Sequence, residues 1–117
     1  MKHDEIIKMI EGSGFINYGR EHGNSDVLCF GKRLESGCEC DFNNRLPGIL
    51  VRYFIESPIK NFNIEKNIEF VLYGEANGVW VHLSLYSICA DEFLSVLDRA
   101  ESALSAMWNI GYKELSK

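Results

Sequence analysis

Apolar residues follow helical spacing near both ends of the chain. Four of them do so near the start: Ile6, Ile7, Met9 and Ile10. Six more do so near the end: Phe93, Val96, Leu97, Ala100, Leu104 and Met107. These spacings predict a short helix over residues 4–11, ended by Gly12 and Gly14, and a long helix over residues 90–110.

Between these two segments, apolar and polar residues alternate as they do in half-buried β-strands. The clearest strand covers residues 49–56, where Ile49, Val51 and Tyr53 fall on one face. Two further strands, over 67–73 and 79–86, flank Asn77-Gly78, a pair that favours a hairpin turn. Weaker patterns predict three more strands, over 15–18, 26–30 and 38–42. Turns are predicted over 19–25 and 31–33.

The order of these elements predicts a single α+β domain over residues 1–117. Most connections between strands are too short for helical crossovers, so we expect an antiparallel sheet of about five strands. The short N-terminal helix and the long C-terminal helix would pack on one face of it. Alternation in the hairpin puts Tyr73, Trp80 and Tyr86 on the opposite, less apolar face. We expect that face to be partly exposed.

The composition describes a folded, acidic chain. Of 117 residues, 46% are hydrophobic, and 12 basic against 17 acidic side chains leave a net charge of −5. The apolar content excludes a mainly disordered chain. Basic residues form no cluster longer than Lys32-Arg33, which argues against direct binding of nucleic acid. Without a secretory signal or an apolar run that could span a bilayer, we expect a cytoplasmic protein with reduced cysteines.

Residue types that carry chemistry occur without a catalytic or metal-binding pattern. Cys38 and Cys40 form one tight pair but lack the second pair of a usual zinc site, so we expect mostly buried, reduced thiols. Three carboxylates lie near them: Glu35, Glu39 and Asp41. Three histidines could serve catalysis: His3, His22 and His82. No family spacing links them to a nucleophile, so we expect no enzyme, no cofactor and no metal, and an enzyme using His22 or His82 is the third hypothesis.

The stretch from residue 65 to residue 101 combines many acidic side chains with aromatic ones. This combination is typical of protein-binding surfaces, because aromatic side chains anchor contacts and charges steer the encounter. The predicted contact residues are Glu69, Glu75, Trp80, Asp91, Glu92, Asp98 and Glu101. We expect a protein partner with a basic surface. Alternatively, Tyr73 and Trp80 pack beneath a loop over 57–66.

This small, acidic, single-domain chain resembles the immunity proteins of bacterial toxin systems, including those of contact-dependent growth inhibition. The segment FLSVLDRAESALSAMW, residues 93–108, is similar in style to their last helices. The resemblance implies a cytoplasmic protein that binds one cognate toxin domain, often a basic nuclease, and neutralises it by non-covalent occlusion. In size and charge the chain is also similar to type III secretion chaperones, which typically dimerise. A chaperone or another small protein-binding adaptor is therefore the alternative.

Overall fold

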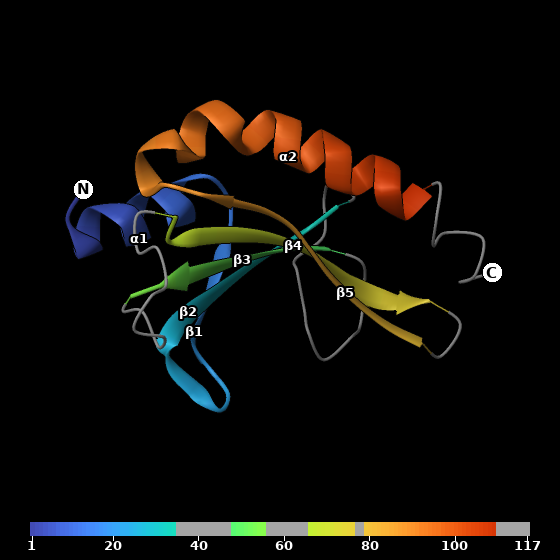
Figure 1. The fold of residues 1–117 in the computed structure, drawn as a ribbon, viewed down its shortest axis with the longest axis horizontal. Coiled ribbons are helices and arrows are strands. Elements are labelled where there is room, and N and C mark those ends of the chain that lie inside the picture. Colours follow the sequence, from blue (N-terminus) through green and yellow to red (C-terminus); the bar gives the residue numbers. More distant parts are fainter. Residues whose placement is uncertain (35–47, 56–65, 77–78, 110–117) are drawn as a thin grey trace.

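A computed structural model describes residues 1–34, 48–55, 66–76 and 79–109. The elements follow in the order α1 (His3–Gly12), β1 (Ile16–Glu21), β2 (Asn24–Arg33), β3 (Gly48–Phe54), β4 (Ile68–Ala76), β5 (Val79–Ile88), the 3-10 turn η2 (Ala90–Glu92) and α2 (Phe93–Met107). The strands form one antiparallel sheet in the order β1-β2-β3-β4-β5. The predicted α+β fold is confirmed, with a helix at each end of the strand series (Figure 1).

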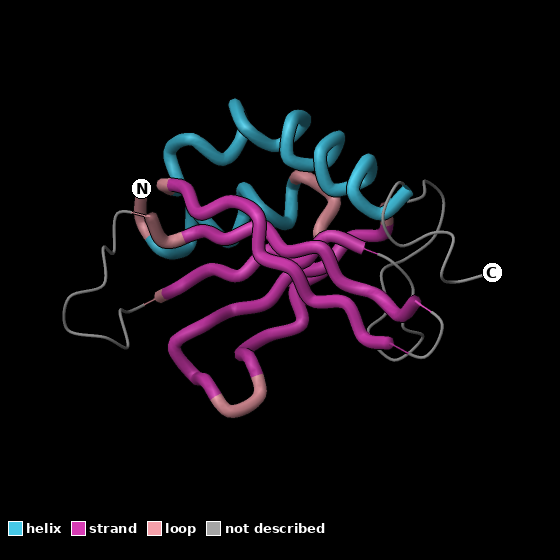
Figure 2. The backbone as a smooth tube through the Cα atoms, turned by 45° about the vertical axis from the view of Figure 1, so that its right-hand side comes forward, coloured by secondary structure: helices cyan, strands magenta, loops and turns pink. Residues whose placement is uncertain are grey.

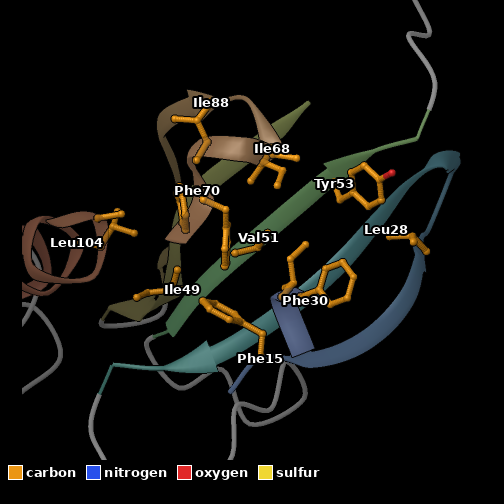
Figure 3. Close-up of a cluster of buried hydrophobic side chains, with 14 of the residues drawn as sticks. Phe15, Leu28, Phe30, Ile49, Val51, Tyr53, Ile68, Phe70, Ile88 and Leu104 are labelled. Carbon is orange, nitrogen blue, oxygen red and sulfur yellow. The ribbon is translucent and has the colours of Figure 1, made fainter. Parts of the chain in front are cut away.

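Both helices cover the same face of the sheet, as Figure 2 shows. Leu104 of α2 joins one apolar cluster with alternate residues of the inner strands (Figure 3). Ile10 of α1 belongs to the same cluster. At its centre, the ring of Phe93 stacks on Phe70 with 5.6 Å between centroids. Phe93 also meets Phe15 edge-on at 6.2 Å. This helix face is the larger core of the molecule.

The opposite face of the sheet carries a second, smaller apolar cluster. Its members are Val27, Cys29, Leu50, Phe54, Val71 and Tyr73. The face is partly exposed as expected, because His82 and Ser84 of β5 are exposed on it, but Tyr73 itself is fully buried. Tyr73 fits there because its cross-strand neighbour is Gly48, where a Cβ atom would lie 2.6 Å from the tyrosine hydroxyl. A glycine thus makes room for the largest fully buried side chain among the described residues.

Two of the predicted turns are strand instead. Residues 19–21 continue β1, residues 24–25 begin β2, and only His22 and Gly23 form the turn between them. Residues 31–33 remain in β2 because they pair with the first residues of β3. This tertiary pairing outweighs the local turn preference of Gly-Lys-Arg. Gly19, with φ of 81°, absorbs a register shift within β1.

An irregularity in β5 changes which of its residues share a face. Leu72 pairs with Leu83, but Phe70 pairs with Tyr86, so β5 contains one extra residue between these pairs. Strict alternation along β5, from which the faces of the hairpin were predicted, is therefore interrupted between Ser84 and Tyr86, and a local pattern cannot anticipate such a bulge. The predicted strand over 38–42 and the turn at 77–78 lie outside the described residues.

Candidate protein-binding surface

The predicted contact residues do not gather on one surface. Glu69 lies on the sheet face opposite α2, because it alternates with Phe70, which faces that helix. The remaining described acids lie on η2 and α2: Asp91, Glu92, Asp98 and Glu101. Glu75 and Trp80 pair across the β4–β5 hairpin, and their side chains are outside the described part of the structure.

Glu69 belongs to an ion-pair network inside this chain. Arg52 Nη1 donates to Glu69 Oε1 at 3.3 Å, and Arg52 Nη2 donates to Glu21 Oε2 at 2.7 Å. The guanidinium also lies 5.0 Å above the ring of Phe54. Burial lowers the pKa of Arg52, but the hydrogen bonds and charges of the two carboxylates outweigh it and raise that pKa. The structure thus gives Glu69 an internal partner.

Cys29 lies beside this network and has the properties of an inert thiol. Its Sγ is 4.0 Å from Glu21 Oε2. Burial first, and then the negative charge of Glu21, raise the pKa of this thiol to about 11, against a smaller opposing effect of Arg52. A thiol that stays protonated at neutral pH is a poor nucleophile and a poor metal ligand.

The other candidates for chemistry are dispersed. His3 Nδ1 lies 3.1 Å from the hydroxyl of Tyr53, His22 is in the β1–β2 turn, and His82 is exposed on β5. Among the described residues, no group of three His, Cys, Asp or Glu side chains could hold a metal ion. The cysteine and carboxylate cluster over 35–41 lies outside the described ranges.

A pocket of about 210 Å³ lies between α2 and the ends of β2 and β3. It is lined by Lys32, Arg33, Leu34, Ile49, Glu101 and Ser105. Its volume is below that of usual small-molecule sites. Lys32 Nζ donates to Glu101 Oε1 at 3.0 Å, so the predicted contact residue Glu101 has a partner on β2.

The outer side of η2 and α2 presents three exposed acids around an exposed leucine. Asp91, Leu94 and Asp98 are spaced three and four residues apart, which places them along one stripe of the helix. The side chain of Asp91 is 78% exposed and Leu94 is 65% exposed. Glu92 is also exposed beside them, and we call these four residues the acidic helix face.

Two positive groups lie beside the acidic helix face, the side chain of Arg99 and the terminal amine of Met1. Arg99 is its exposed basic neighbour on α2. The terminal amine of Met1 lies 3.9 Å from a carboxylate oxygen of Asp91, and Met1 is itself 55% exposed. An apolar side chain among exposed carboxylates is a feature of contact surfaces, where the apolar group provides affinity and the charges orient the partner.

Sequence reasoning found the acids of this surface but missed Leu94. It also placed Tyr73 among the partly exposed aromatic side chains, whereas Tyr73 is buried. A signal for Leu94 was present in the spacing. The residue next to Phe93 falls between the apolar positions that point into the core, so it lies on the solvent side of the helix.

Comparison of this chain with protein-family models, curated proteins and solved structures finds no match. Within the described residues, every helix is too short or too polar to cross a membrane.

Proposed function

We propose that this chain is a cytoplasmic immunity protein that binds a cognate bacterial toxin domain and neutralises it by non-covalent occlusion. The partner presents a basic surface, which is typical of a nuclease domain. The observation that carries the proposal is the acidic helix face, where Leu94 is 65% exposed between carboxylates. This chain supplies contact area and charge, and it carries out no bond-making step.

The charges of the acidic helix face act at long range, and Leu94 acts at contact. Exposed carboxylates attract a basic partner and speed the encounter, an effect that salt weakens. Burying Leu94 against an apolar depression then removes its side chain from water, which slows dissociation. The net charge of −5 adds to the same attraction.

Two of the acids have a structural role as well. Asp91 and Glu92 lie in η2, directly before α2, where the dipole of that helix favours negative charge. Asp98 lies in the middle of α2 and gains little from the dipole. A substitution of Asp98 should therefore change partner binding with the smallest accompanying change in the stability of the chain.

The test is protection of growing bacteria against a toxin. The chain is co-produced with the toxin domain encoded beside its gene, and growth is compared with that of cells producing the toxin domain alone. We expect protection, and we expect the triple variant Asp91→Lys, Glu92→Lys and Asp98→Lys to lose it. The matched control reverses three exposed acids of α1, namely Asp4→Lys, Glu5→Lys and Glu11→Lys, with the same change in net charge.

Association rates measured at low and high salt separate steering from contact. The α2 variant should associate more slowly with a flatter salt dependence, whereas Leu94→Ser should mainly speed dissociation. Equal protection by the α2 variant would remove the acidic helix face from the proposal. Failure to protect, with binding to a substrate of a secretion apparatus instead, would favour the chaperone alternative.

A further inference from the structure

The two edges of the sheet differ in how open they are to another strand. β1 has 6 residues, two register shifts and a glycine at φ of 81°. β5 has 10 residues, and its sequence VWVHLSLYSI contains no charge, proline or glycine. Short length, bulges and charges are the usual means of blocking a sheet edge. β1 is short, has two register shifts and contains Arg20 and Glu21, whereas β5 has only one irregularity.

The outer side of β5 faces no other described strand. Among the described strands, β5 has a neighbour on one side only, which is β4. In an antiparallel strand, the N–H and C=O groups of alternate residues point away from that neighbour. The side chains of His82, Ser84 and Ser87 are exposed, so small or uncharged groups flank this edge. A long strand of this kind is a template for an added strand.

The position of β5 connects this edge to the acidic helix face. α2 packs on β4 and β5, and Figure 1 shows it running along one face of the sheet. β5 ends at Ile88, and Asp91 and Glu92 follow within four residues. η2 lies toward β4, since the N–H of Ala90 donates to Asn67 Oδ1, so Asp91 and Glu92 attract basic side chains of a strand added beside β5 through their charge, without direct contact.

A second copy of this chain fits the edge less well than a basic strand does. Two β5 strands paired antiparallel are related by a twofold axis normal to the sheet, which puts both α2 helices on the same side. The acidic helix faces would then belong to one continuous surface, and each copy carries a net charge of −5. Repulsion between the two negatively charged copies opposes that arrangement, whereas a basic segment is attracted to the chain.

We infer that β5 accepts an extended, basic segment of the partner protein as an additional strand. The inference rests on the proposed function, since it names the segment of the partner that docks beside the acidic helix face. Backbone hydrogen bonds to β5 hold this segment, and the negative charges of Asp91 and Glu92 attract its basic side chains. The segment alternates basic and β-favouring residues, because successive side chains of a strand point to opposite faces.

A synthetic peptide of alternating threonine and lysine serves as the probe. The control peptide has the same two residues with a proline at every third position, which keeps basic charge but cannot pair as a strand. Binding is followed by NMR, together with hydrogen exchange of the backbone amides of the full chain. We expect slower exchange at alternate residues of β5 and binding at least about tenfold tighter than that of the control, because several backbone hydrogen bonds form.

A matched pair of variants tests the location. Ser84→Lys adds a positive charge on β5, and Ser25→Lys adds the same charge at an exposed serine of β2. We expect the first to weaken peptide binding several-fold and the second to leave it unchanged. Equal binding of both peptides, protection on β1, or no protection on β5 would each overturn the inference. So would a dimer in sedimentation that Ser84→Lys dissociates, since the occupant would then be a second copy.

The outcome is separable from that of the growth test. Protected β5 amides without protection of cells would keep the strand-accepting edge and remove the toxin as its partner. Protection of cells without any effect on β5 would keep the immunity function and leave α2 as the contact surface.

Discussion

Each face of the sheet carries a buried apolar cluster, but different kinds of interaction hold the two faces. The helix face is apolar throughout its cluster, and aromatic stacking of Phe93 on Phe70 joins α2 to β4. The opposite face combines a small apolar cluster with the Arg52 network and the close approach of Tyr73 to Gly48. The stability of the helix face depends on the amount of apolar area that it buries. The stability of the opposite face depends on particular pairs of residues.

This difference determines how each face responds to substitution. An apolar core loses stability roughly with the volume removed. On a face that contains a charged network or a close contact with the backbone, removing one partner lowers the stability even when little apolar area is lost. Substitutions on the two faces therefore test two different sources of stability.

Removing the Phe93 ring should have the largest effect. Phe93→Ala empties the space between Phe70 and Phe15, and we expect a loss of about 3–5 kcal/mol in the free energy of unfolding. Urea denaturation followed by circular dichroism measures it. The neighbouring Leu94→Ala, at an exposed position of the same helix, should stay within about 0.5 kcal/mol of the parent chain. Similar losses for both would contradict the burial of Phe93 in this core.

The helix face was the part of the fold that the sequence pattern predicted best. Helical spacing of apolar residues and alternation in the inner strands are local signals, and they are sufficient to define a sheet with helices on one side. The opposite face could not be predicted in the same way. Pairing of Arg52 with Glu21 joins residues 31 positions apart, and room for Tyr73 depends on a glycine in the neighbouring strand.

The candidate site was predictable to a similar extent. The acids of η2 and α2 were identified by type and position. Glu69 of β4 and Glu101 of α2, however, each pair with a basic residue of a different strand, which spacing cannot reveal. The bulge in β5 likewise depends on pairing with β4. Local pattern thus predicts which residues face outward on a helix, and tertiary pairing determines which charges remain available.

Adding a methyl group at Gly48 should have the second largest effect, on the face opposite the helices. In Gly48→Ala the new Cβ would lie 2.6 Å from the Tyr73 hydroxyl and 2.8 Å from the backbone oxygen of Lys32. We expect a loss of about 2–3 kcal/mol, because backbone and a buried ring must both move. Thermal unfolding measures it. Gly12→Ala, with no neighbouring atom within 4 Å, is the control and should not destabilise the chain.

Removing the cation of the network should cost less. Arg52→Met keeps apolar contact with Phe54 but leaves the half-buried Glu21 and Glu69 near each other without a positive charge. We expect a loss of about 1–2 kcal/mol at neutral pH. Adding Glu21→Gln and Glu69→Gln to this variant should recover part of the loss, because the remaining like charges are removed. No recovery would show that the network contributes through packing alone.

The smallest effect is the pH dependence that Cys29 adds to the same face. Its pKa is raised from the ordinary value of 9.0 to about 11, so the folded state holds the thiol proton more tightly than the unfolded state does. This contribution is fully present below pH 9.0 and is lost as the pH rises towards about 11. We expect Cys29 to account for a decline of about 1 kcal/mol in the free energy of unfolding by about pH 10.

Replacing the thiol isolates that contribution from the other groups that titrate at high pH. Denaturation under reducing conditions over this range should show a flatter decline for Cys29→Ala than for the parent chain. Identical slopes for Cys29→Ala and the parent chain would mean that the Cys29 thiol is hydrated in the folded state. The small cluster would then be open to water at its border with the ion pairs, whereas the helix face is closed.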